Sequence, residues 1–151
     1  ARLRHLSQTA GAHTQWSEVA GAWNEAEAAV RSAMADVDDE RMQDPAFLAR
    51  VLTAIVYQSR LEYEEAIEDG RFTKAYEYHD SRGFMRVGRE LLDTHAAAFR
   101  SASTDDHEAL VQRFEAIMEA WPSVQPPEKP ALSVSELYGR VSSFEFVANR
   151  F

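Results

Sequence analysis

The chain has 151 residues, 45% hydrophobic and 27% charged, which suits a single globular domain over residues 1–151 and excludes wholesale disorder. A formal net charge of −9 without a basic face excludes nucleic acid as a partner and disfavours anionic membrane surfaces, whereas it suits metal ions and cationic partners. The lack of cysteine excludes disulfides, thiolate zinc sites and iron–sulfur clusters, and no apolar run approaches the roughly 20 residues of a membrane span. From the abrupt start at Ala1 we expect a domain that is processed or excised from a longer chain.

The first two predicted helices occupy the N-terminal half. Apolar side chains recur at helical spacing over residues 3–34, which predicts one long helix. Asp44 and Pro45 are typical of an N-cap and a first helical residue, so a second helix begins there and ends at Gly70. The stripe expected to face the core on this second helix consists of Phe47, Val51, Ile55, Gln58, Glu62 and Glu65 or Ala66.

The next two predicted helices lie between residues 73 and 121. The third takes Thr73 as its N-cap and ends near Arg100. Its predicted inward stripe consists of Phe72, Tyr76, His79, Gly83, Val87, Leu91 and His95. The fourth takes Thr104 as its cap and ends before Pro122. Its apolar face consists of Leu110, Val111, Phe114, Ile117, Met118 and Trp121.

A proline-rich segment precedes the last predicted helix. Three prolines lie within residues 123–130, which predicts an extended crossover on the surface, and Ser133 and Glu136 then form a capping box. With only 6 Gly and 5 Pro the chain lacks the turns of a sandwich or barrel. We therefore predict an all-α fold, an antiparallel four-helix bundle with one additional helix and a proline-rich crossover before the last helix.

Polar residues interrupt the inward stripes near Gly70. Gln58, Glu62 and Glu65 are spaced by four and three residues, so they share one side of their helix. If the chain folds back at Gly70, Glu62 and His79 lie at similar depth, and we expect them to be in contact. A carboxylate beside an imidazole is able to bind a metal, form an ion pair or move a proton.

A transition-metal ion is the cofactor that this arrangement suits. The predicted ligands are Glu62, Glu65, His79, Asp80 and His13. Two structural interpretations remain open, because glutamates at the edge of an apolar stripe commonly reach water and a histidine at a core position is commonly a hydrogen-bonded packing residue. The Glu-x-x-His repeats of ferritin-like di-iron proteins are absent, which argues against that class of enzyme.

Two segments around Gly70 resemble a known pattern. The chain reads EYEEAIEDG from Glu62 and EYHD from Glu77. This is similar to E-Y-x-x-A-hydrophobic-x-D-G followed by E-Y-x-D, a pattern of helical extracytoplasmic domains that accompany bacterial iron permeases and archaeal halocyanin-type copper proteins. The later stretch from Trp121 to Glu145 is similar to the second part of those domains. The resemblance implies metal or redox traffic outside the cytoplasm, with Glu62, Glu77 and Asp80 at matching positions.

Two functional hypotheses follow from these observations. The first is an extracytoplasmic accessory domain, periplasmic or on the cell surface, that binds a cation at the helical hairpin around Gly70 and serves a membrane or redox partner protein. The second is a non-catalytic docking module that presents an acidic helical surface to a partner protein and binds no small ligand. An enzymatic role ranks below both, since no nucleophile motif or phosphate-binding glycine loop is present.

Overall fold

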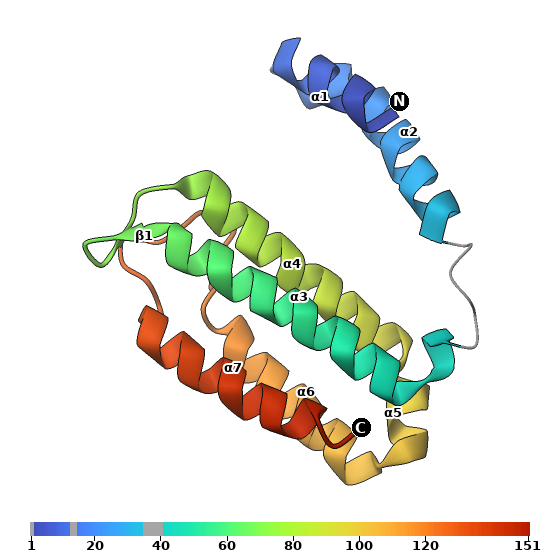
Figure 1. The fold of residues 1–151 in the computed structure, drawn as a ribbon. Helices are drawn as coiled ribbons and strands as arrows, with labels where there is room; N and C mark the ends of the chain where they lie inside the picture. The colour runs from blue at the N-terminus through green and yellow to red at the C-terminus, as the bar shows by residue number, and fades with distance from the viewer. Residues whose placement is uncertain (1, 13–14, 35–40) are drawn as a thin grey trace. The chain divides into compact units, whose positions relative to one another are not determined.

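The computed structural model describes residues 2–12, 15–34 and 41–151 (Figure 1). Contacts between residues divide the chain into two compact units, Ala1–Asp39 and Glu40–Phe151. The expectation of one domain over residues 1–151 stays a prediction. Among the described residues no helix is both long and apolar enough to cross a membrane.

The N-terminal unit is a pair of helices. α1 spans Arg2–Ala12 and α2 spans Trp16–Met34, and the two pack against each other. The single helix predicted over residues 3–34 is therefore wrong. Gly11, a poor helix former, lies next to the end of α1, and the helix pair allows Ala22 and Ala26 of α2 to be buried.

The C-terminal unit confirms the all-α prediction. It contains the 3-10 helix η1 (Arg41–Gln43), the helices α3 (Pro45–Glu65), α4 (Ala75–Thr94), α5 (Ala96–Ala102), α6 (Thr104–Met118) and α7 (Val134–Ala148), and the strands β1 (Ile67–Glu68) and β2 (Arg71–Phe72). Four of these helices form the bundle: α3 packs against α4 and α7, and α6 packs against α7 (Figure 1). The short α5 packs against α6, and the strands form a single antiparallel pair.

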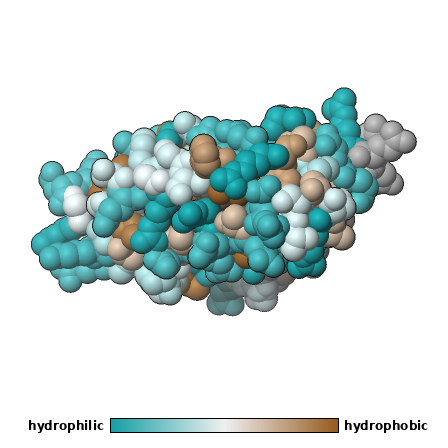
Figure 2. Space-filling view, turned by 90° about the horizontal axis from the view of Figure 1, so that it is seen from below, coloured by the Kyte–Doolittle hydropathy of each residue, from teal (hydrophilic) through white to brown (hydrophobic). Residues whose placement is uncertain are grey.

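The core of the bundle lies along one stripe of each long helix. Its fully buried large side chains are Tyr63, Tyr78, Phe99, Phe114, Phe144, Leu48, Leu52, Met85, Leu92, Leu110, Ile117 and Leu137. The predicted apolar face of α6 is confirmed, because its residues are buried or packed against this core. The face that the sequence predicts for α7, Leu137, Val141, Phe144 and Ala148 or Val147, is confirmed as well, because all of these residues are buried. At the surface, apolar residues occur in small patches among hydrophilic ones, as Figure 2 shows for one face.

The predicted inward stripes of α3 and α4 are wrong in phase. On α4 the buried residues are Tyr78, Ser81, Met85, Gly88 and Leu92, whereas the predicted Tyr76, His79, Gly83 and Val87 are exposed. On α3 the buried stripe runs through Leu48, Leu52, Val56, Ser59 and Tyr63, and most of the predicted residues flank it half-buried. Of the two alternatives at the end of the predicted stripe, Glu65 is exposed and Ala66 is buried in the core. Small and polar residues at core positions caused the error.

These small residues bring α3 and α4 close together. The Ser59 hydroxyl donates to the backbone oxygen of Ser81 at 2.8 Å, and the Ser81 hydroxyl donates to the backbone oxygen of Ser59 at 2.7 Å. At Gly88 an added Cβ would lie 3.1 Å from the Phe114 ring and 3.2 Å from Leu52. Both buried hydroxyls are thereby satisfied, and the two helix backbones are held in a fixed register.

The connection from α3 to α4 is a tight hairpin. α3 ends at Glu65, and Ile67 pairs with Phe72 across a turn in which Asp69 and Gly70 have φ values of 52° and 72°. Positive φ at both central residues is the geometry of a type I′ turn, which Asp-Gly favours. Gly70 therefore shapes this turn and does not terminate α3 as predicted.

Three predicted helix boundaries also need correction. Thr73 does not cap α4, because Lys74 is the N-cap residue and the Thr73 hydroxyl contacts Glu68. The helix predicted to reach Arg100 ends at Thr94, and α5 then turns Phe99 into the core. The cap of α6 is Ser103, whose hydroxyl accepts from the backbone N–H of Asp106, in place of the predicted Thr104.

The proline-rich crossover and the start of α7 are as predicted. No regular helix or strand runs through residues 119–133, and residues 122–130 are exposed or half-buried. Asp44 caps α3 by accepting from the Ala46 N–H, with Pro45 at the first helical position. The capping box of Ser133 and Glu136 is complete, with both reciprocal hydrogen bonds present.

Candidate metal centre

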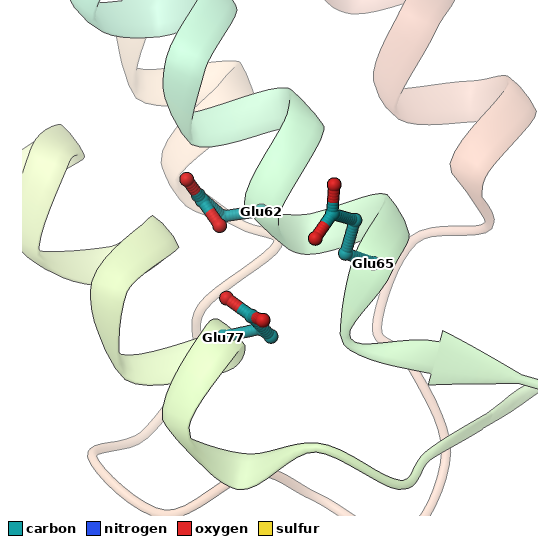
Figure 3. Close-up of side chains that lie close together, drawn as sticks. All are labelled: Glu62, Glu65 and Glu77. Atoms are coloured by element: carbon teal, nitrogen blue, oxygen red, sulfur yellow. The ribbon is translucent and has the colours of Figure 1, made fainter.

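Three glutamates meet where the hairpin joins α3 to α4. Glu62 and Glu65 lie in the last turn of α3, and Glu77 lies in the first turn of α4 (Figure 3). One carboxylate oxygen from each lies within 4.8 Å of those of the other two. Glu62 and Glu77 are half-buried, whereas Glu65 is exposed, so the cluster is open to solvent on one side.

Two Glu-Tyr dipeptides explain this placement. Tyr63 follows Glu62 and Tyr78 follows Glu77, and both tyrosines are fully buried. Successive residues on a helix are rotated by about 100°, so a buried tyrosine places the preceding glutamate at the edge of the core. In the antiparallel pair of α3 and α4, these two edges lie against each other and the carboxylates converge.

The tyrosines belong to a rigid aromatic cluster at this end of the bundle. The Tyr63 ring lies 5.4 Å from Phe72 and 5.2 Å from Trp121, and the Phe72 ring lies 4.8 Å from Tyr78, all edge to face. The Tyr63 hydroxyl donates to the backbone oxygen of Leu132 at 2.8 Å, and the Tyr78 hydroxyl donates to that of Ser123 at 2.7 Å. Desolvation raises the pKa of Tyr63 to about 12, so this hydroxyl stays a donor at every physiological pH.

The electrostatics of the cluster favour a positive ligand. Desolvation, a hydrogen bond with Glu62 and the negative charges of Glu62 and Glu65 raise the pKa of Glu77. Gln58 donates from Nε2 to Glu62 Oε1 at 2.6 Å, which orients that carboxylate. No lysine, arginine or histidine forms an ion pair with any of the three glutamates among the described residues. The three like charges therefore lie close together without a basic side chain beside them among the described residues.

Three convergent carboxylates are an oxygen donor set. Metal–oxygen distances are about 2.0–2.6 Å, so ligand atoms up to about 5 Å apart fit around one ion. Carboxylates suit hard cations such as Mg²⁺, Mn²⁺, Ca²⁺ and iron more than soft copper(I). The open side of the cluster leaves coordination positions for water or for a further ligand.

The structure brings together only part of the predicted ligand set. Glu62 and Glu65 lie in the cluster, as the sequence predicts for neighbouring ligands. His79 and Asp80 are exposed on α4 and outside the group, and His13 lies outside the described residues. Ligand roles for these three residues stay predictions.

The predicted contact between Glu62 and His79 is wrong. No hydrogen bond or ion pair joins these two described side chains; Glu62 contacts Gln58 and Glu77, and the His79 ring lies beside Tyr78 at 5.9 Å. The cause is helical phase, because Tyr78 takes the buried position on α4 and turns its neighbour His79 toward solvent.

Glu77 was missing from the predicted ligand set, although the resemblance around Gly70 placed it at a matching position. Its hydropathy gave no signal, since an exposed glutamate in the first turn of a helix is ordinary. The signal that identifies it is the repeated Glu-Tyr dipeptide, in which each tyrosine is a core residue.

Comparison with known proteins identifies the bundle. No curated protein and no solved structure matches the chain. Residues 38–145 match the iron permease-associated 4-helix bundle domain, a match that covers most of the C-terminal unit and more than half of the chain. The segment from Glu62 to Asp80, which carries the hairpin and the carboxylate cluster, lies inside it. The chain therefore belongs to the family of iron permease-associated four-helix bundle domains.

Proposed function

We propose that this domain binds a cation at Glu62, Glu65 and Glu77 and acts as an accessory to an iron permease, a membrane protein, on the extracytoplasmic side. The observation that carries the proposal is the convergence of three carboxylate oxygens within 4.8 Å without a neutralising side chain among the described residues. Family membership supports an iron permease as the partner. The resemblance of the EYEEAIEDG and EYHD segments to extracytoplasmic domains supports the location.

The charge of the protein supports this role. A formal net charge of −9 raises the local concentration of cations around the domain. A cation at the cluster replaces the proton that the raised pKa of Glu77 favours, so binding releases protons and strengthens as the pH rises.

The geometry suits transfer of iron as cargo more than permanent storage. Glu65 is exposed, and three protein ligands leave further coordination positions open. An ion held in this way exchanges with water or with a carboxylate of another protein. The domain would then concentrate iron beside the permease and release it there.

Metal binding is tested by calorimetric titration of the untagged protein with Mn²⁺ and, without oxygen, with Fe²⁺. The test variant is Glu62→Gln, Glu65→Gln, Glu77→Gln. The matched control is Glu90→Gln, Glu108→Gln, Glu128→Gln, which changes the same number of exposed or half-buried charges elsewhere. We expect stoichiometric binding by the wild type and the control, and a loss of at least about tenfold in affinity for the test variant.

The outcomes separate the two functional hypotheses. Equal affinities of both triple variants would mean that cations respond only to net charge, and no stoichiometric binding by the wild type would leave the acidic docking module as the function. The location is tested by protease treatment of intact cells that express the full-length protein. Degradation only after lysis of the cytoplasmic membrane would contradict the extracytoplasmic assignment.

A further inference from the structure

The N-terminal pair of helices is a separate addition to the family domain. The contact boundary between the two units lies at Asp39 and Glu40, and the family match begins at residue 38. Two independent observations, one from packing and one from sequence, therefore place the same boundary. The function proposed for the bundle does not use α1 or α2.

This unit is too small to bury its own apolar side chains. It spans Ala1–Asp39, and chains below about 40 residues rarely fold without a disulfide, a metal or association with a second chain. No cysteine is present. On α2, Ala22 and Ala26 are buried, whereas Trp16 and Trp23 are 63% and 47% exposed. The largest side chains of the unit thus lie outside its small core.

The exposed large apolar residues on α2 are spaced as in a heptad repeat. Trp16, Trp23 and Val30 are seven residues apart, and a second series three residues further on consists of Val19, Ala26 and Ala33. These are the a and d positions of a coiled-coil seam. The middle d residue, Ala26, is buried in the unit, whereas the a residues remain exposed, Val30 by 42%. The Trp16 and Trp23 rings lie 6.0 Å apart along this open edge.

The charge of the two helices suits a second copy of the same chain as the occupant. α1 and α2 together carry three arginines and three glutamates, so the whole formal net charge of −9 lies outside them. The helices α1 and α2 of two copies would therefore not repel each other. Two such antiparallel helix pairs with an apolar seam form a four-helix bundle. Anionic membrane surfaces, in contrast, attract basic helices.

We infer that α2 pairs with α2 of a second copy along Trp16, Trp23 and Val30, so that the N-terminal unit dimerises the protein. The symmetric interface is isologous, because the same surface is used on both chains. Each chain then carries one carboxylate-bearing bundle, and the dimer presents two of them to its partner. This inference does not depend on metal binding by the bundle.

The mass in solution tests the inference directly. Light scattering during size-exclusion chromatography of the full chain should give twice the monomer mass of 17.1 kDa. Val30→Glu places a charge in the seam and should raise the Kd of the dimer at least about tenfold. Val87→Glu is the matched control, because Val87 is a comparably exposed valine on a helix of the bundle and should leave the dimer intact. A monomeric wild type, or equal dimerisation of both variants, would overturn the inference.

A second measurement does not depend on folding of the Val30→Glu variant. Because the chain lacks cysteine, a single introduced cysteine forms a disulfide only between copies. Trp23 is the middle of the three seam residues, so it lies close to its counterpart whether the helices run parallel and in register or antiparallel. Mild oxidation should convert Trp23→Cys, but not Val87→Cys, to a covalent dimer. Failure to cross-link, or a monomer that sediments with neutral phosphatidylcholine vesicles in a manner that depends on Trp23, would instead overturn self-association.

Discussion

Gly88 shows at the scale of one residue how closely α3, α4 and α6 approach. An added Cβ would lie 3.1 Å from the Phe114 ring and 3.2 Å from Leu52, both of which are buried. Gly88→Ala should therefore lower the free energy of unfolding by about 1–3 kcal/mol, despite the better helix propensity of alanine. Denaturant unfolding measures this. Gly83→Ala is the control, because apart from its own helix backbone and chain neighbours no described atom lies within 4 Å of an added Cβ at Gly83. A stabilised Gly88→Ala would mean that the contact relaxes without cost.

His107 makes the end of the bundle sensitive to acid. It is 5% exposed and stacks on Phe99, and neither ring nitrogen has a hydrogen-bond partner in the described part of the chain. Desolvation, with a smaller contribution from Arg100 and opposed by Glu108, lowers its pKa. The folded protein therefore favours the neutral ring, so this contribution to stability is complete above the unfolded pKa of about 6.5 and is lost as the pH falls toward the lowered folded pKa.

Replacing His107 tests this dependence. The melting temperature of the wild type should fall more between pH 7 and pH 5 than that of His107→Phe, because only the wild type binds an extra proton on unfolding. The carboxylates whose pKa values are lowered in the fold, Asp106 and Glu136, titrate below this window and are shared by both proteins. Parallel curves for the two proteins would show that His107 does not titrate on unfolding.

At the scale of elements, the start of α7 depends on one hydroxyl. The Ser133 side chain accepts from the Glu136 backbone N–H, and the Glu136 carboxylate accepts in return from the Ser133 backbone N–H. Ser133→Ala should cost about 0.5–2 kcal/mol of unfolding free energy, and Ser133→Asp should restore most of it. Chemical denaturation of the three proteins measures both steps. A loss that Ser133→Asp fails to restore would assign the effect to something other than capping.

The elements also show how far the sequence predicts the fold. The faces of α6 and α7 were predicted correctly because their buried residues are large and apolar. The faces of α3 and α4 were not, because Ser59, Ser81 and Gly88 occupy core positions where a hydropathy pattern expects leucine or valine. Only the packed structure shows that these small residues allow two backbones to approach.

The candidate site could be predicted from the sequence only in part, for the same reason. Glu62 and Glu65 were predicted as neighbours because their spacing lies within one helix, which local geometry determines. Whether Glu77 or His79 lies beside Glu62 depends on the rotation of α4 against α3, which long-range packing determines. The structure therefore brings a glutamate of α4, and not His79, beside Glu62, so the side chains that meet there offer oxygen donors alone.

At the scale of the whole molecule, the carboxylate cluster couples stability to pH. The raised pKa of Glu77 means that the folded state favours its protonated form, so this contribution is complete below the ordinary value of 4.5 and is lost as the pH rises through the raised pKa. Glu77→Gln should therefore melt at a higher temperature than the wild type at pH 7 and at the same temperature near pH 4. Differential scanning calorimetry at the two pH values measures the difference.

At pH 7, added Mn²⁺ should raise the melting temperature of the wild type above that of Glu77→Gln. The wild type should gain melting temperature with the cation concentration, since a ligand that binds only the folded state stabilises it by RT ln(1 + [L]/Kd), and Glu77→Gln should gain less. The control is Glu90→Gln, which removes one exposed charge from α4 away from the cluster. Equal gains for all three proteins would point to unspecific screening of the acidic surface.

The two tyrosine hydroxyls that reach the crossover have a consequence for how the chain tolerates change. The Tyr78 hydroxyl donates a hydrogen bond to Ser123 and the Tyr63 hydroxyl donates one to Leu132. The crossover between Ser123 and Leu132 is therefore held at both ends by the bundle. The length of the crossover therefore has little effect on the position of α7. Lengthening it costs only the entropy of loop closure, which grows slowly with the number of residues. This segment is where evolution, or an experimenter, could insert a peptide or a fluorescent reporter beside the cluster without dismantling the bundle.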